Sequence, residues 1–265
     1  MVDAEELKAW YSNTAVMFEI AKAARFKEMR ISGDFEIRWL TPFTIRYLTE
    51  IIRFCSLLKS PANIYRSLED YDRIDSMSFN LKKRKLQYVE WDKVRGSHVS
   101  GTDFAIDLDD ENKSFINVIN DADKIKLVLD KYQVLYAMWM SGNKGFHFLI
   151  PHYSIPKWIQ DMNYIERMDF FSIFADKSMS GIKSLDMSIY TSTRVIKYPF
   201  TISKSGNVIL PLNDAEYSLL REGKLSLKPS DVLKERKIRD RGVFFRGTIE
   251  GTHNFFNQVV EGEIK

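Results

Sequence analysis

An acidic pair closes an apolar segment near the middle of the chain. Asp107 and Asp109 end the run Phe104–Asp109, whose other members are apolar. In a strand, residues two positions apart point to the same face, so these carboxylates would project side by side while Ile106 and Leu108 face the core. Two like charges this close are costly unless a cation compensates them, and Mg²⁺ and Mn²⁺ prefer such oxygen ligands. The pair predicts a metal site; the alternative is an ordinary strand end that opens into solvent.

The same Asp-x-Asp pattern occurs twice more in the chain. Asp70 and Asp72 lie in the polar stretch 69–80, which we interpret as a loop. Asp121 and Asp123 lie on a predicted helix that is rich in charged residues. Acidic residues in such places are mostly exposed. We therefore interpret both pairs as solvated surface.

A glycine-containing turn lies between two apolar segments. Residues 141–147 read Ser-Gly-Asn-Lys-Gly-Phe-His. Glycines in a tight turn let backbone N–H groups approach a ligand, and Ser141, Lys144 and His147 add donors of the kind that hold phosphates. The alternative is a hairpin turn with a solvated lysine and a histidine that packs on the sheet.

A third acidic residue, Asp186, begins the alternating run Leu185–Tyr190, which we interpret as a strand. Three isolated basic residues follow it, namely Arg194, Lys197 and Lys204. Some of these cations could face the same cleft as the aspartates, where they would attract anionic groups. The alternative is an exposed sheet, in which such isolated charges are typical.

The elements that must position these residues follow from the spacing of apolar residues and from the breaks between segments. Helices are predicted over residues 3–29, 41–58, 114–131, 156–175 and 231–241. Strands are predicted over residues 35–40, 63–68, 86–91, 102–108, 134–140 and 146–150, with further short strands between 181 and 210. This mixture predicts an α+β or α/β protein.

The composition narrows the class of protein further. The 265 residues include 39 Lys+Arg and 36 Asp+Glu, so a nucleic-acid-binding face would require local clustering of basic residues. The single cysteine, Cys55, excludes an intrachain disulfide and a cysteine-rich zinc site, and four histidines argue against a histidine-rich one. The acidic start and the lack of an apolar run of about 20 residues predict an intracellular protein that is cytoplasmic or nucleoid-associated and not secreted.

The order of the three motifs resembles that of the archaeo-eukaryotic primase superfamily, in particular the catalytic small subunit of DNA primase and primase-polymerase domains. The family's three motifs match residues 104–109, 141–147 and 185–206. Upstream, Trp10-Tyr11 and Arg38-Trp39 fit the family's looser elements, so the resemblance covers residues 10 to 210. The spacing within the second motif agrees residue for residue.

The resemblance implies roles for individual residues. Asp107, Asp109 and Asp186 would be the catalytic, metal-binding carboxylates, which together hold two Mg²⁺ or Mn²⁺ ions. The residues that would bind the nucleotide are Ser141, Lys144, His147, Lys197, Lys204 and Arg194.

The sequence also departs from the family's pattern at three points. Asn143 stands where the family carries a basic residue. Ser203 stands where its primases usually carry a histidine, and Lys204 follows one residue sooner than expected. Family small subunits commonly carry a zinc knuckle, which one cysteine cannot build. The chain therefore resembles a reduced catalytic core, without structural zinc.

The implied fold is the α+β primase-polymerase fold, with an RRM-like catalytic sheet and an N-terminal αβ unit on the two sides of one cleft. We predict a catalytic domain over residues 1–220, followed by a charged helix and tail over residues 221–265. The implied activity is template-directed nucleotidyl transfer from NTPs or dNTPs, making short primers by a two-metal mechanism. The implied partners are single-stranded DNA and a primase large subunit or other replication proteins, and no membrane.

Two groups of basic residues could contact template phosphates. One is the run 82–85, and the other is the cluster Lys234, Arg236, Lys237, Arg239 and Arg241. For the second group we favour a solvated helix face, because Glu235 and Asp240 are interleaved with it.

Two other functions remain open at this point. A metal-dependent glycosyltransferase could use Asp107 and Asp109 to hold a nucleotide-sugar pyrophosphate, although it leaves the second motif unexplained. A non-catalytic, primase-like accessory subunit could bind nucleic acid alone, although such a protein would be expected to lose the metal carboxylates.

Overall fold

The structure is a computed structural model that describes residues 2–24, 27–32, 43–44, 62–71, 99–109, 114–191, 195–235 and 243–262. Several predicted features lie outside these residues: the strands 35–40 and 86–91, nearly all of the helix 41–58, the basic run 82–85, Cys55 and Arg194. Among the described helices, none has the length and apolar character needed to cross a membrane.

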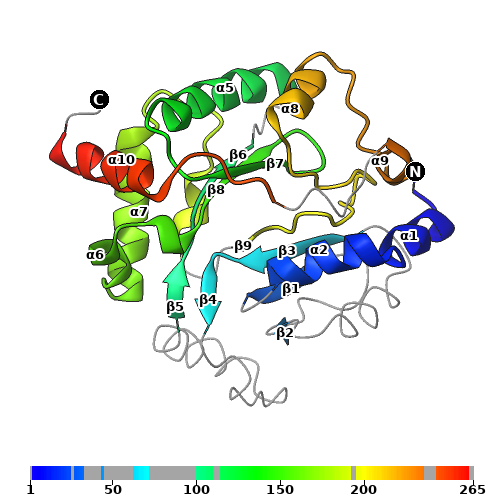
Figure 1. Ribbon diagram of the computed structural model, residues 1–265, viewed down its shortest axis with the longest axis horizontal. Helices are drawn as coiled ribbons and strands as arrows, with labels where there is room; N and C mark the ends of the chain where they lie inside the picture. Colours follow the sequence, from blue (N-terminus) through cyan, green and yellow to red (C-terminus); the bar gives the residue numbers. More distant parts are fainter. Residues whose placement is uncertain are drawn as a thin grey trace.

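A three-stranded antiparallel sheet carries most of the predicted site. Its order is β6 (Phe104–Leu108), β8 (Phe146–Ile150), β7 (Ala137–Met140). Because β8 is antiparallel to both neighbours, β6 and β7 run parallel, and helix α5 (Phe115–Lys131) connects them. This is a split βαβ arrangement. Figure 1 shows α5 lying across one face of the sheet.

The two faces of this sheet differ in chemistry because side chains alternate along each strand. One face presents Phe104, Phe146 and their neighbours to α5, to α7 (Tyr164–Ser178) and to α10 (Ile249–Glu261). Phe104 lies 5.1 Å from Phe171 and 5.8 Å from Phe256, measured between ring centroids, so aromatic packing closes this face. The opposite face carries Asp107 and the residues paired with it.

A second sheet lies below the first in Figure 1. Its order is β2 (Phe43–Thr44), β1 (Glu28–Ser32), β3 (Asn63–Ser67), β9 (Val195–Lys197), and all neighbours are antiparallel. Strand β9 comes from the third motif, so this otherwise N-terminal sheet contains a strand from the second half of the chain. The helices α1 (Ala4–Tyr11) and α2 (Thr14–Ala24) accompany it.

Helix α1 is tied to the segment that follows β9. The indole Nε1 of Trp10 donates to the carbonyl oxygen of Phe200 at 2.9 Å, and the backbone N–H of Ile202 donates to the Tyr11 hydroxyl at 3.0 Å. Phe200 has a φ of 63°, a conformation that non-glycine residues rarely adopt. Such strain persists only when the surroundings fix the backbone, and Trp10 supplies part of that support.

The remaining elements surround these two sheets. Strands β4 (Glu69–Tyr71) and β5 (Val99–Thr102) form a two-stranded sheet. The short helices are η3 (His152–Ser154), α6 (Lys157–Gln160), η4 (Met187–Tyr190), α8 (Asp214–Arg221) and α9 (Pro229–Glu235).

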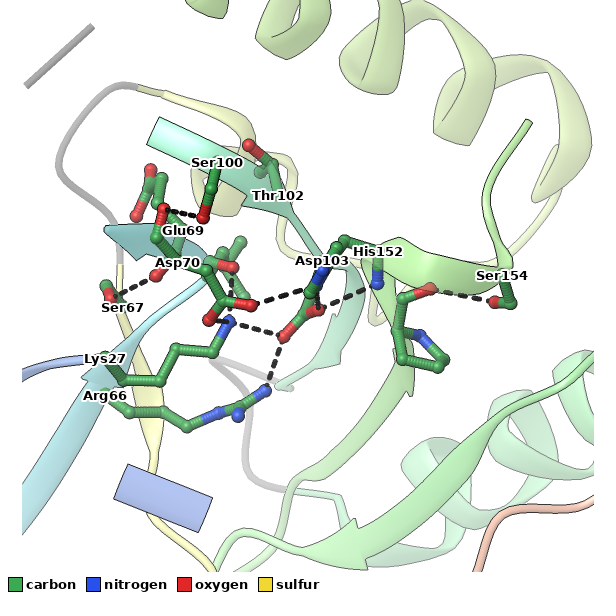
Figure 2. Close-up of polar contacts among 12 residues, drawn as sticks. Lys27, Arg66, Ser67, Glu69, Asp70, Ser100, Thr102, Asp103, His152 and Ser154 are labelled. Atoms are coloured by element: carbon green, nitrogen blue, oxygen red, sulfur yellow. Dashed lines mark hydrogen bonds and ion pairs between the residues drawn. The ribbon is translucent and has the colours of Figure 1, made fainter. Parts of the chain in front are cut away.

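A buried group of charged side chains joins the parts of the molecule around β3, β4 and β6 (Figure 2). Lys27 donates to Asp103 at 2.8 Å and pairs with Asp70 at 2.7 Å, and Arg66 donates to Asp103 at 2.8 Å. Nδ1 of His152 lies 2.9 Å from Asp70. Burial by itself would raise the pKa of Asp103, but Lys27, the His152 hydrogen bond and Arg66 hold it far below its ordinary value.

The structure confirms several predicted elements. These are the strand near 63–68, the helix at 114–131 and the strand at 146–150, seen as β3, α5 and β8. The helix predicted over 3–29 is wrong in extent: Asn13 accepts from the N–H groups of Ala15 and Val16 and so begins a separate helix, and residues 28–32 pair as β1.

Other predicted boundaries also differ from the structure. The loop predicted over 69–80 begins instead with β4, and residues 43–44, predicted to be helical, pair as β2. The long helix predicted over 156–175 is two helices, because Asn163 caps α7 by accepting from the N–H of Glu166. Helices α8 and α10 were not predicted.

His152 should make stability depend on pH. Its hydrogen bonds to Asp103 and then to Asp70 raise its pKa from 6.5 to about 9. Because the folded protein holds this proton more tightly than the unfolded chain does, protonated His152 stabilises the fold. This contribution is fully present below pH 6.5 and is lost as the pH rises through about 9. Between pH 6.5 and about 9, we expect the unfolding free energy of the wild type to fall by about 2 kcal/mol more than that of His152→Gln. This figure allows for the partial exposure of His152. Denaturant titrations of both proteins test this, and equal losses would contradict it.

Candidate active site

The three predicted metal carboxylates come from two backbone segments that lie side by side. The N–H of Asp109 donates to the carbonyl oxygen of Ser184 at 2.9 Å, and the N–H of Asp186 donates to the carbonyl oxygen of Asp107 at 2.8 Å. Between these bonds, Leu108 and Leu185 form an antiparallel bridge. Asp186 therefore lies beside the end of β6, next to both other aspartates.

Asp186 does not begin a strand, as its alternating sequence had suggested. It is the N-cap of the 3₁₀ helix η4, and its Oδ1 accepts a hydrogen bond from the N–H of Ser188 at 2.9 Å. The 3₁₀ turn brings Tyr190 under the carboxylates, where its hydroxyl donates to the carbonyl oxygen of Ala105 at 2.8 Å. Burial, with the charges of Asp107 and Asp186, raises the pKa of Tyr190 well above its ordinary value. Both carboxylates therefore disfavour ionisation of the same buried hydroxyl.

His147 lies directly across from Asp107 in the pairing of β6 with β8. Its Nε2 is 3.2 Å from Oδ1 of Asp107, and its ring is 5.8 Å from that of Trp139 on β7. The His147 side chain is buried, whereas that of Asp107 is 23% exposed. Within the described residues, Nδ1 of His147 has no hydrogen-bond partner. The histidine thus connects the second motif to the first.

The turn at residues 141–145 packs tightly. The N–H of Ser141 donates to the Gly145 carbonyl oxygen, and the Ser141 hydroxyl accepts from the N–H of Gly145. Gly142 has a φ of 83°, and a Cβ there would lie 2.7 Å from Cβ of Ser203. A Cβ on Gly145 would lie only 2.5 Å from the carbonyl oxygen of Leu108. Both glycines are therefore required by conformation or space.

The third motif closes over this turn. Nζ of Lys197 donates to the carbonyl oxygen of Ser141 at 3.1 Å, and the hydroxyls of Ser203 and Ser205 donate to the carbonyl oxygen of Gly142. Lys204 is exposed, and its N–H donates to Asn63 Oδ1 on β3. Lys144 is half-buried within the turn. These contacts bring the second and third motifs together at Ser141 and Gly142. Arg194 lies outside the described residues.

The donor set of the three aspartates fits a hard divalent cation, because carboxylate oxygens are the ligands that Mg²⁺ and Mn²⁺ prefer. Their backbone segments are adjacent, and Asp109 is exposed while Asp107 and Asp186 are half-buried. Within the part of the chain that is described, however, no three acidic, histidine or cysteine side chains are arranged as a group that could hold a metal ion. The backbone therefore places the ligands, and binding would require their side chains to turn toward one ion.

Two acidic residues that we interpreted as solvated surface are not solvated. Asp70 lies on β4, and its side chain is 13% exposed and paired with Lys27 and His152. Asp121 is buried, and its Oδ2 accepts three hydrogen bonds from Lys183 and Ser184.

A sequence signal for Asp121 did exist. It lies three residues after Val118 and four before Ile125, both buried, so it is on the apolar face of α5. Asp123, on the same helix, is half-buried, and it accepts a hydrogen bond from the Tyr217 hydroxyl at 2.9 Å.

A cavity of about 250 Å³ lies on the side of the three-stranded sheet that carries His147. Two of its lining residues, Trp139 and Leu149, are on the same face of the three-stranded sheet as His147. Its described lining consists of Glu19, Lys22, Arg66, Trp139, Leu149, Pro199, Val243 and Phe245. This lining contains none of the predicted site residues.

Gly145→Ala should disrupt the contact between the first and second motifs. The added Cβ would meet the Leu108 backbone, which cannot move without shifting the end of β6 and with it Asp107. We expect a loss of about 1–3 kcal/mol in unfolding free energy, measured by denaturant titration. Gly223→Ala is a reference for backbone strain without crowding, because Gly223 has a φ of 68° and nothing lies within 4 Å of an added Cβ, whereas Gly145 has no positive φ. An unchanged unfolding free energy in Gly145→Ala would show that the close approach at Gly145 is unimportant.

Comparison with known proteins finds a similar fold but no related sequence. No family model matches the chain, and no curated protein matches it. Among solved structures, the chain is similar to the polymerase domain of Ligase D from Mycobacterium tuberculosis, determined in complex with DNA. The TM-score is 0.53 at 11% sequence identity, and the match covers 88% of each chain. The mixed α+β fold of this chain is thus distantly similar to that of a polymerase domain.

Proposed function

We propose that this protein is a primase-polymerase that transfers nucleotides from NTPs or dNTPs in a template-directed reaction. The observation that carries the proposal is the meeting of three separate motifs at the end of β6. Backbone hydrogen bonds bring Asp186 beside Asp107 and Asp109, and Lys197 reaches the turn that begins at Ser141. The distant fold similarity to a polymerase domain supports the same reaction class.

The aspartates and the turn would have separate tasks. Asp107, Asp109 and Asp186 would hold two Mg²⁺ or Mn²⁺ ions. When bound, these ions would activate the attacking 3′-hydroxyl and neutralise charge on the leaving pyrophosphate. The turn would bind the triphosphate through the Ser141 hydroxyl, through Lys144 and through backbone N–H groups.

Two of the proposed phosphate ligands are engaged with the protein itself. Lys197 donates to the Ser141 carbonyl oxygen, and His147 lies against Asp107. A triphosphate oxygen is a stronger acceptor than a neutral carbonyl oxygen, because hydrogen bonds between ionised groups are the stronger ones. Lys197 would therefore exchange its carbonyl partner for the phosphate when a nucleotide binds. Lys204 and Arg194 complete the proposed set of phosphate-binding cations.

The proposed partners are a single-stranded DNA template and a primase large subunit or other replication proteins. The Ligase D domain was determined in complex with DNA, which is consistent with nucleic-acid binding by this fold. The basic run 82–85 is the proposed template contact. Of the C-terminal basic cluster, only Lys234 lies within the described residues, and it is exposed, in agreement with a solvated helix face.

Asp107→Asn and Asp109→Asn should each abolish nucleotide incorporation, because each removes a carboxylate charge that would hold a divalent cation. We expect a loss of at least about 1000-fold in incorporation on a single-stranded template, measured with labelled rNTPs and dNTPs and Mg²⁺ or Mn²⁺. Asp169→Asn is the control, because Asp169 is exposed on α7 and belongs to none of the three motifs. If both active-site variants retained wild-type incorporation while folding normally, the proposed function would be wrong.

Lys197→Met should weaken nucleotide binding while keeping the aliphatic stem that packs beside β3. A lost charge-assisted hydrogen bond corresponds to about 1.5 kcal/mol, so we expect a rise of roughly tenfold in the KM for the nucleotide. Steady-state incorporation kinetics measure this. Lys224→Met, which removes an exposed lysine paired with Glu222, should leave KM unchanged. An unchanged KM in Lys197→Met would remove Lys197 from the nucleotide site.

A further inference from the structure

A buried carboxylate lies directly behind the segment that carries Asp186. Oδ2 of Asp121 accepts from the N–H of Lys183 at 2.9 Å, from the N–H of Ser184 at 3.0 Å and from the Ser184 hydroxyl at 3.0 Å. Its other oxygen, Oδ1, accepts from Nζ of Lys124 at 2.7 Å. Burial raises the pKa of Asp121, but the hydrogen bonds from Lys124 and Ser184 outweigh it and hold the pKa below its ordinary value.

The segment is held from its other side by β6. The Ser184 carbonyl oxygen accepts from the N–H of Asp109, and the Asp186 N–H donates to the carbonyl oxygen of Asp107. Ser184 is therefore bound by α5 through its N–H and hydroxyl, and by the end of β6 through its carbonyl oxygen. This arrangement fixes the register of residues 184–186 against residues 107–109, and so the position of Asp186.

The chain passes through a glycine turn just before this anchor. Helix α7 ends at Ser178, and Gly181 then adopts a φ of 83° with no atom within 4 Å of an added Cβ. An open glycine turn has many accessible conformations, so it does not by itself determine where the following residues lie. The Asp121 carboxylate meets the chain immediately after this turn, two and three residues before Asp186.

We propose that Asp121 is a positioning residue for the metal site. It clamps the Lys183–Ser184 backbone between α5 and β6, and so holds Asp186 opposite Asp107 and near Asp109. The inference rests on the proposed function, because it assigns Asp121 a role toward the metal carboxylates. Residues that orient metal ligands without touching the metal typically change metal affinity by about 10- to 100-fold when they are replaced.

Two substitutions separate positioning from charge. Asp121→Asn removes the negative charge but keeps a carbonyl oxygen that can accept from the N–H groups of Lys183 and Ser184. The new NH₂ group would face Lys124, whose side chain is 58% exposed and can turn to solvent. Asp121→Glu keeps the charge but adds one methylene, which displaces the carboxylate from its partners. A positioning role predicts that Asn is tolerated and Glu is not, whereas a purely electrostatic role predicts the reverse.

The probe is Mn²⁺ alone, added to the full chain without nucleotide or DNA, with binding followed by electron paramagnetic resonance of free Mn²⁺. We expect Asp121→Glu to weaken Mn²⁺ binding about 10-fold or more and Asp121→Asn to remain within about threefold of wild type. Amide hydrogen exchange at Lys183 and Ser184, measured without metal, should accelerate in the Glu variant only. If thermal unfolding shows that Asp121→Glu does not fold, Asp121→Ala takes its place. We expect the same weaker Mn²⁺ binding and faster exchange in Asp121→Ala.

Asp123→Glu is the matched control, because Asp123 is on the same helix but bonds to Tyr217 rather than to the Asp186 segment. It should leave Mn²⁺ affinity and exchange at Lys183 and Ser184 unchanged. Wild-type affinity and exchange in Asp121→Glu would overturn the positioning role while leaving the proposed function intact. Failure of wild type to bind Mn²⁺, or binding that is unaffected by Asp107→Asn, would instead overturn the metal site and the role of Asp121 with it.

Discussion

The pairing of β6 with the segment at residues 184–186 is the constraint on which the site depends. The backbones of Asp107, Asp109 and Asp186 lie side by side at this point. Two backbone hydrogen bonds and a bridge between Leu108 and Leu185 hold them there. Leu108 is buried and Leu185 packs against the core, so burial of these side chains stabilises the pairing in addition to the hydrogen bonds. The apolar packing beneath the site thus helps to fix the backbone that carries the three aspartates.

The second motif depends on the same strand. Gly145 approaches the carbonyl oxygen of Leu108, and His147 pairs with Asp107. The third motif reaches the turn through Lys197 and Ser203, whose segment is supported from behind by Trp10. The N-terminal helix is therefore part of the framework of the site, although it carries none of the proposed ligands. The buried charges around Asp103 join the two halves of this framework, and they do so with three cations around two carboxylates.

Some elements around the candidate site were predictable from local patterns in the sequence. The strand β6 and the turn between β7 and β8 were predicted correctly, whereas the roles assigned to their residues stay predictions. The predicted strand at Asp186 was wrong, because period-two alternation in Leu185–Tyr190 does not distinguish a strand from a bridge followed by a 3₁₀ turn. The long N-terminal helix was wrong because continuous apolar spacing concealed the cap at Asn13. The finer claims of an RRM-like sheet, a catalytic domain over residues 1–220 and bound metals stay predictions.

By itself, the sequence determined which residue types were available for chemistry and in what order, since carboxylates, glycines and cations at fixed spacing restrict the possible ligands. Only the tertiary structure decided which of these residues meet. Asp70, Asp107 and Asp121 each belong to an Asp-x-Asp triplet, yet one joins a buried ion cluster, one lies at the candidate metal site and one clamps a backbone segment. The physical reason is that burial and partners are set by segments distant in the chain, and local spacing contains no information about that pairing.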